Sequence, residues 1–156
     1  MRYITRQPHN MSCGPVAVIN ALKWLGYSAT YRDHINSFEW SYKNGIRHSK
    51  ITKSLREYGV KFKIKENPTV SNIEKALDNG RSVMLSWCWY SNSNGKKKSG
   101  RHCVFIDKHT STQIMSKNTW GLHPSNKDFL TKKKLNLDFK IGKRHDYKPK
   151  MWEIIK

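Results

Sequence analysis

The most apolar helical segment of the chain covers residues 13–25. Apolar side chains occupy all but two of its positions after the first turn. A helix that is apolar on nearly every side is usually buried. Ser12 is a typical N-cap, Pro15 is tolerated in the first turn, and Gly26 is a typical C-terminal stop. The pattern therefore predicts a buried helix that begins at Cys13.

The rest of the chain alternates between helical and strand-like patterns. Helical spacing predicts helices over 48–58 and from 69 or 71 to 79, and residues 30–45 are expected to form a short helix and a loop. Alternating or continuous apolar positions predict strands, namely 2–5, 60–65, 82–89, 102–107, 113–116 and 151–155. The expected connections are a flexible basic loop at 91–100, a turn at 109–112 and a long loop at 117–131, while 132–148 carry no clear pattern.

Helices come first in this order and strands later, which is typical of an α+β fold with a central N-terminal helix packed on an antiparallel sheet. A length of 156 residues suits one domain with a real core, and no repeat or linker divides it. A hydrophobic fraction of 37% with many aromatic residues argues against disorder. We therefore expect a single domain over 1–156.

The first residues, M-R-Y-I-T-R-Q-P, lack the apolar core of a signal peptide, and no apolar run is long enough to span a membrane. A cytoplasmic location is the expectation. Because the segment around Cys13 begins close to Met1, we expect no pro-segment before it. Small size and Lys/Asn richness are typical of a phage or viral protein, which would place the chain in an infected cell or a virion.

Thirty Lys and Arg residues against eleven Asp and Glu residues give a net charge of +19. Such a charge favours acidic partners, which are nucleic acid, an anionic surface or acidic proteins. The basic residues are scattered with local clusters at 96–98, 132–134 and 140–150, and none forms a known nucleic-acid motif. Genome composition and solubility are the alternative explanation.

Cys13 has a position that could activate its thiol. Free N–H groups and the helix dipole at the start of a helix favour a thiolate over a thiol. A nucleophilic cysteine also needs a base, a residue that orients the base, and donors for an oxyanion. A small apolar cysteine at a helix start is the alternative.

The three cysteines, Cys13, Cys88 and Cys103, are an odd number without a C-x-x-C pair. This favours a reducing compartment over a disulfide framework or a zinc site rich in cysteine. Cys13, His102 and Cys103 are poor zinc ligands as a set, because adjacent strand residues point to opposite faces. We expect no cofactor or metal, and we expect Cys88 and Cys103 in the core.

His102 is the candidate base, at the start of a predicted core strand. With a hairpin turn at 109–112, His102 lies opposite Asn118 or Thr119 on the next strand. An amide there could orient one imidazole nitrogen and leave the other for the thiolate, and Trp120 could cover that hydrogen bond. Residue types and order thus suggest a Cys, His and Asn set.

Plainer roles exist for the same residues. His102 could be a satisfied strand histidine, Asn118 could terminate a strand, and Gln7 could be an exposed loop residue. The other histidines are expected at the surface, namely His9, His34, His48, His109, His123 and His145.

Two short motifs resemble those of cysteine peptidases. Q-x5-C-G-P before an apolar helix, which includes Gly14, resembles the N-terminal motif of peptidase family C39, the bacteriocin-processing peptidases, and of C39-like domains. K-N-T-W-G at 117–121 is similar to K-N-S-W-G of papain. The resemblance implies a papain-like fold over the whole chain and thiol-protease activity on a protein or peptide substrate.

The resemblance also implies roles. Cys13 would be the nucleophile and His102 the general base and then acid. Asn118 would orient His102, Trp120 would shield that contact, and Gln7 would stabilise the oxyanion with the Cys13 N–H.

Two positions depart from the C39 pattern. The residue before the cysteine is usually acidic there and is Ser12 here, and the third catalytic member is usually Asp and is Asn118 here. The Asn is normal for papain. The sequence carries no transporter segment such as many C39 peptidases have, so the resemblance does not imply processing of double-glycine leaders.

Three functions fit these observations. The first is a papain-like cysteine peptidase with a thioester acyl-enzyme. The second keeps the acyl chemistry with another donor or acceptor, as in a deamidase, a transglutaminase or a deubiquitinase. The third is a non-catalytic basic protein that binds nucleic acid or another acidic partner.

Overall fold

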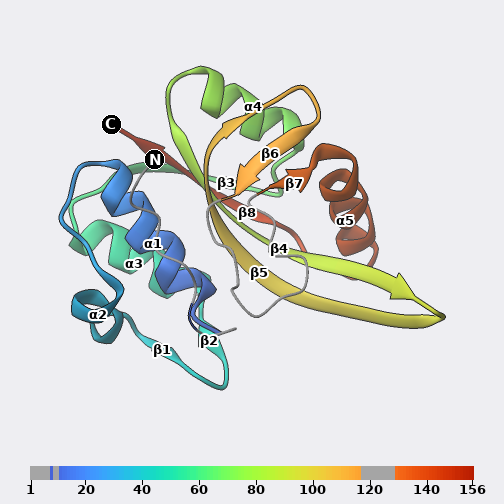
Figure 1. The fold of residues 1–156 in the computed structure, drawn as a ribbon, viewed down its shortest axis with the longest axis horizontal. Coiled ribbons are helices and arrows are strands. Elements are labelled where there is room, and N and C mark those ends of the chain that lie inside the picture. Colours follow the sequence, from blue (N-terminus) through green and yellow to red (C-terminus); the bar gives the residue numbers. More distant parts are fainter. Residues whose placement is uncertain (1–7, 9–10, 117–128) are drawn as a thin grey trace.

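A computed structural model describes residues 8, 11–116 and 129–156 (Figure 1). Its helices are α1 (Cys13–Trp24), α2 (Tyr31–His34), the 3-10 helix η1 (Ile35–Ser37), α3 (His48–Glu57), α4 (Val70–Asp78) and α5 (Lys132–Arg144). Its strands are β1 (Trp40–Ser41), β2 (Gly45–Ile46), β3 (Lys61–Glu66), β4 (Ser82–Ser93), β5 (Lys96–His109), β6 (Gln113–Ser116), β7 (Leu130–Thr131) and β8 (Lys150–Ile155).

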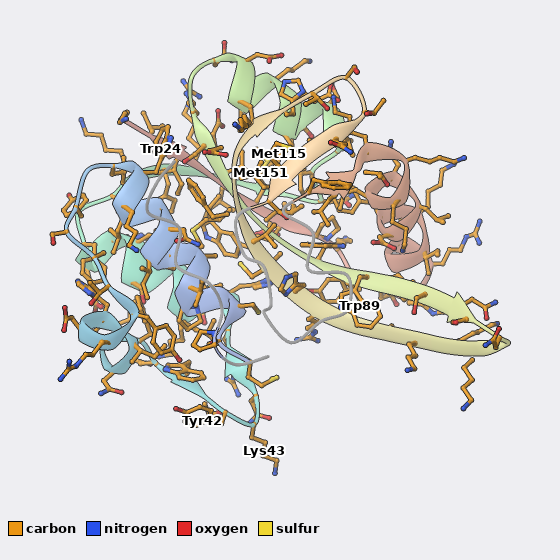
Figure 2. The ribbon with its side chains drawn as sticks, viewed as in Figure 1. Trp24, Tyr42, Lys43, Trp89, Met115 and Met151 are labelled. Atoms are coloured by element: carbon orange, nitrogen blue, oxygen red, sulfur yellow. The ribbon has the colours of Figure 1, made fainter. Side chains whose placement is uncertain are left out.

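A six-stranded sheet in the order β3-β8-β4-β5-β6-β7 forms the middle layer, and each neighbouring pair is antiparallel. The C-terminal strand β8 lies inside the sheet, between β3 and β4. Strands β1 and β2 form a separate small hairpin, whose tip is marked by Tyr42 and Lys43 in Figure 2. The predicted α+β fold, with helices packed on an antiparallel sheet, is confirmed.

Helices cover both faces of this sheet (Figure 1). On one face, α1 and α3 pack against residues such as Met84, Phe105 and Trp152. On the other face, α4 and α5 pack against residues such as Val104 and Ile106. Neighbouring residues of β5 therefore belong to opposite cores, as strand alternation requires.

Helix α1 is buried as its apolar pattern predicts, and its residues from Gly14 to Leu22 are all buried. Ser12 occupies the N-cap position, but its side chain does not accept a hydrogen bond from the helix. The Ser12 hydroxyl is instead hydrogen-bonded to Tyr31, and this bond opposes the rise that burial causes in the pKa of Tyr31. Ser12 therefore holds the predicted N-cap position, while its buried hydroxyl finds its partner in Tyr31 and not in the helix.

The expected flexible loop at 91–100 is wrong. These residues extend β4 and β5 into a long arm that projects from the body of the molecule (Figure 1). Asn94 and Gly95, with φ of 53° and 77°, form a two-residue turn between Ser93 and Lys96. Asn-Gly is the strongest short hairpin signal, because both residues accept a positive φ.

Strands β5 and β6 pair as expected but in another register. The predicted register sets Ile106 opposite residue 114 or 115, whereas Ile106 pairs with Ser116. The difference arises at the turn, where His109 pairs with Ile114, and an irregularity between Ile106 and Lys108 that adds a residue to β5 reduces it by one. The predicted pairing of His102 with Asn118 lies outside the described residues.

Residues 132–144, which had no assignment, form helix α5. Thr131 caps the helix by accepting a hydrogen bond from the Lys134 N–H. Leu135 and Phe139 lie one turn apart and pack into the core under α5. The many lysines of this segment made its short apolar pattern difficult to recognise in the sequence.

No helix in the described part of the chain is both long and apolar enough to cross a membrane.

Removing the Phe105 side chain should strongly destabilise the fold. Phe105 is fully buried between the sheet and α1, where its ring packs against Trp24. We expect Phe105→Ala to lower the free energy of unfolding by about 3–5 kcal/mol in urea titrations, because the cavity cannot collapse fully. The control Leu137→Ala, at a side chain that is 49% exposed, should change it by less than about 0.5 kcal/mol. Equal losses for the two variants would contradict this assignment of the core.

Candidate active-site cleft

A cavity of about 960 Å³ opens beside the N-terminal end of α1. We call it the Cys13 cavity. Three parts of the chain line it: residues 11, 13 and 14, residues 39–41 and 44–51, and residues 86 and 101–103 of the sheet. Two of the residues expected to carry chemistry, Cys13 and His102, are both in this lining.

Cys13 lies half-buried at the first position of α1. Its sulfur meets β5 at Cys103, whose backbone hydrogen-bonds to it together with the backbone of Gly14 and Cys13. The close packing of Gly14 fixes this position, because a Cβ added at Gly14 would collide with the Ile46 side chain of β2. The close contact between α1 and the Ile46 side chain therefore requires a glycine directly after Cys13.

Burial raises the pKa of the Cys13 thiol, and the backbone hydrogen bonds only partly oppose the rise. The sequence-based expectation that the start of α1 favours a thiolate is therefore wrong for this arrangement. Desolvation of the charged sulfur outweighs the N–H donors and the helix dipole. Cys13 is protonated at neutral pH unless a base takes its proton.

His102 lies on β5 opposite Trp87 of β4. The two rings pack edge to face, with centroids 5.6 Å apart. The Trp87 indole N–H donates to the Asp138 carboxylate of α5 at 3.2 Å, and the Tyr90 backbone N–H donates to the same carboxylate at 3.2 Å. Asp138 and Trp87 therefore form a fixed support beneath His102.

Strand alternation separates the two neighbours His102 and Cys103. Cys103 belongs to the core under α1, and Trp87, the partner of His102, belongs to the core under α4 and α5. Cys13 thus reaches β5 at the backbone of Cys103, one residue from His102. The expectation that Cys103 is a core residue is confirmed, whereas Cys88 is only half-buried.

Three of the expected site residues, Gln7, Asn118 and Trp120, lie outside the described residues.

His48 lines the same cavity, although the sequence pattern placed it at the surface. It begins α3, its Nε2 lies 2.7 Å from the Ser86 hydroxyl, and its ring packs edge-on against Trp152. Burial lowers the pKa of His48, and the charges of Lys150 and Arg101 lower this pKa further. His48 is therefore a neutral imidazole at neutral pH in the same cavity as Cys13.

No local sequence signal marks His48, because a histidine at a helix start reads as exposed. His109 is a second partly covered histidine: its Nε2 lies 2.7 Å from Asp78, and its side chain is 20% exposed.

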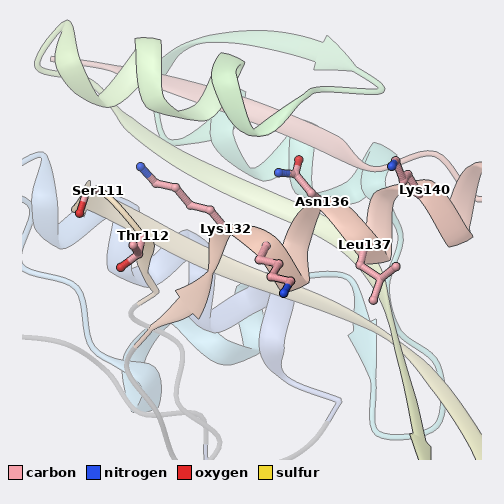
Figure 3. A pocket seen from close by; sticks show the side chains of 7 residues that line it. Ser111, Thr112, Lys132, Asn136, Leu137 and Lys140 are labelled. Atoms are coloured by element: carbon pink, nitrogen blue, oxygen red, sulfur yellow. The ribbon is translucent and has the colours of Figure 1, made fainter.

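A second hollow, of about 600 Å³, lies between the turn after β5 and helix α5 (Figure 3). We call it the lysine hollow. It is lined by Ser111, Thr112, Lys132, Lys133, Asn136, Leu137 and Lys140. Lys132 forms an ion pair with Glu74 at 2.9 Å. The lining of the lysine hollow holds no cysteine or histidine. Of the two hollows, only the Cys13 cavity is lined by both a candidate nucleophile and a candidate base.

The alkylation rate of Cys13 should rise with pH through a midpoint above that of an ordinary thiol. Iodoacetamide reacts with the thiolate, and burial keeps the proton on the sulfur. The rate can be followed by mass spectrometry of the Cys13 peptide, with the urea-unfolded chain as control. A plateau already reached at neutral pH would contradict this prediction.

His48 should titrate below the value of an ordinary histidine, about 6.5. Because the pKa of His48 is lowered in the folded state, its ring stays neutral at pH values where an ordinary histidine is already protonated. It gains a proton only at lower pH. Its ring resonances in NMR spectra give the midpoint. Arg101→Gln should raise that midpoint by removing one repelling charge, whereas Lys140→Gln in the lysine hollow should leave it unchanged. A midpoint at or above that of the unfolded chain would count against the buried position.

No family model and no curated protein matches this sequence. Among solved structures, the chain is similar to a protein of Bacillus anthracis described as a "putative C39-like peptidase". The match has a TM-score of 0.64 at 10% identity, and it covers 96% of this chain and 92% of that chain. The chain therefore has the fold of that C39-like peptidase.

Proposed function

We propose that the chain is a cysteine peptidase that hydrolyses peptide bonds in a protein or peptide substrate. One observation carries the proposal: Cys13 and His102 line one cavity, at the start of a buried helix and on the strand beside it. The likeness of the fold to a C39-like peptidase supports it.

In the proposed reaction, the Cys13 sulfur attacks the carbonyl carbon of the scissile bond and His102 takes the thiol proton. The backbone N–H of Cys13 and the side chain of Gln7 stabilise the oxyanion. His102 then gives the proton to the leaving amine as the C–N bond breaks. Water attacks the resulting thioester, which releases the acid and regenerates the thiol.

The remaining proposed residues act on His102. Asn118 would orient the imidazole, and Trp120 would exclude water from that hydrogen bond. Because burial raises the pKa of Cys13, the free enzyme needs this base to form the nucleophile. The ring support from Trp87 and Asp138 fits such a role, since a base works only in a fixed position.

A peptide-based probe with a thiol-reactive end group tests the assignment. It should label Cys13 in preference to Cys88 and Cys103, and His102→Ala should reduce the labelling rate by about 100-fold or more. Cleavage of a mixed peptide library, read by mass spectrometry, should be lost in Cys13→Ala and kept in Cys88→Ala.

His48→Ala is the matched variant, because it removes the other histidine of the same cavity. It should slow labelling much less than His102→Ala. The reverse order would make His48 the base and overturn the role of His102. Equal labelling of all three cysteines would contradict a catalytic Cys13.

The same experiment distinguishes the other functions. A mass increase of about one dalton or a cross-link in a target, in place of cleavage, would indicate a deamidase or another acyl transferase on the same residues. An unreactive Cys13 with binding to DNA or RNA that falls steeply with salt would indicate a basic binding protein.

A further inference from the structure

Cations dominate the charged residues around the Cys13 cavity. Arg47, Lys50 and Arg101 are in its lining, and Glu39 is the one carboxylate among the described lining residues. They come from two elements, because Arg47 is the N-cap of α3, Lys50 lies in its first turn and Arg101 lies in β5. Tertiary folding thus collects them at one opening.

Glu39 does not offset this charge toward a ligand. Its carboxylate forms ion pairs with Lys50 and with Lys53, the latter at 2.7 Å. Hydrogen bonds to Lys50 and Lys53 lower the pKa of Glu39 to about 2, so it stays ionised and paired. Lys53 also pairs with Glu57, so these four groups offset one another and the positive charge of the opening comes from Arg47 and Arg101.

Arg47 and Arg101 are exposed, and neither forms an ion pair within the described part of the chain. Arg101 lies 5.1 Å from the centroid of the Tyr147 ring, which supports its guanidinium without neutralising it. Its place on β5 is directly before His102 and two residues before Cys103, against which the Cys13 sulfur lies. Arg101 is therefore a cation held close to the nucleophile.

His48 lies in the same cavity as these cations, and burial is the main cause of its lowered pKa. Lys150 and Arg101 both lower the pKa of His48, and the opposing effect of Glu66 is smaller. The potential thus reaches the floor of the cavity, where His48 contacts Ser86.

We infer that the Cys13 cavity selects a substrate carboxylate, which Arg101 and Arg47 bind next to the bond that Cys13 attacks. Guanidinium groups suit this role because their planar N–H donors match a carboxylate in pairs. The inference rests on the proposed peptidase function and adds a specificity to it. An Asp or Glu side chain near the scissile bond is the source we favour, and the free C-terminus of a short peptide is the other source of the same group.

A first experiment needs no peptidase activity. Iodoacetate and iodoacetamide alkylate the same thiolate, but only iodoacetate carries a carboxylate. The ratio of their rates at Cys13 should exceed the ratio for the urea-unfolded chain by about tenfold at low salt, and it should fall as salt rises.

Arg101→Gln and Arg47→Gln should each lower this ratio, and Arg101→Lys should restore part of it. Lys140→Gln is the matched control, because it removes one exposed cation from the lysine hollow instead. Thermal unfolding checks that each variant is folded. A ratio equal to that of the unfolded chain, or an equal loss with Lys140→Gln, would overturn the inference.

A second experiment identifies the source of the carboxylate. A peptide library with Glu or Gln at each position around the cleaved bond, made with free and with amidated C-termini, is digested by the wild-type chain. We expect a preference of about tenfold for Glu over Gln at one position, kept in the amidated peptides and reduced in Arg101→Gln. A preference that disappears on amidation would assign the site to a peptide C-terminus and overturn the side-chain source.

The two experiments separate this inference from the proposed function. Cleavage without any preference for a carboxylate would overturn the inference and leave the peptidase intact. A raised iodoacetate ratio that depends on Arg101, without any peptide cleavage, would keep the carboxylate site and remove the peptidase.

Discussion

Helix α1 has no polar face, so every side of it must be covered by another part of the chain. Ile51 and Leu55 of α3 cover one side, and Phe105 of β5 and Trp152 of β8 belong to the same core. Burial of apolar surface is the dominant favourable contribution to folding, and every residue of α1 from Gly14 to Leu22 is buried. Because the first turn of α1 lies at the Cys13 cavity, this burial places the Cys13 side chain in the cavity lining.

The same burial sets the chemistry of Cys13. N–H donors at the start of a helix stabilise a thiolate, but desolvation by burial destabilises the Cys13 thiolate by more. The neutral thiol is therefore the favoured form, and in the proposed reaction His102 would have to take its proton. His102 on β5 packs against the Trp87 ring, and His48 at the start of α3 packs against the Trp152 ring with its Nε2 2.7 Å from the Ser86 hydroxyl.

The local charge at a surface depends on which cations are paired with carboxylates as well as on the composition of the chain. Most carboxylates of the described chain are held by cations, for example Glu66 by Lys150, Glu153 by Arg81 and Asp138 by Lys134. With a net charge of +19, cations outnumber carboxylates, and within the described residues Arg47 and Arg101 form no ion pair. The cations beside Cys13 make the Cys13 cavity positive, and the cations along α5 make the lysine hollow positive. Composition alone could not tell these two places apart.

The sequence by itself determined the elements whose signals are local. The continuous apolar run of α1, the alternation of β3 and the spacing in α3 and α4 each reflect a periodicity that folding does not change. The order of Cys13 and His102 was also readable, and both line one cavity. Gln7, Asn118 and Trp120 stay predictions.

Only the tertiary structure decided what depends on distant residues. His48 became a cavity residue because α3 packs beside Ser86 and Trp152, more than thirty residues away in the chain. The Cys13 pKa depends on how deeply β5 and α1 bury the sulfur, and the sign of the cavity depends on where Arg47 and Arg101 meet. Burial and electrostatics are sums over neighbours in space, and a sequence pattern records only neighbours along the chain.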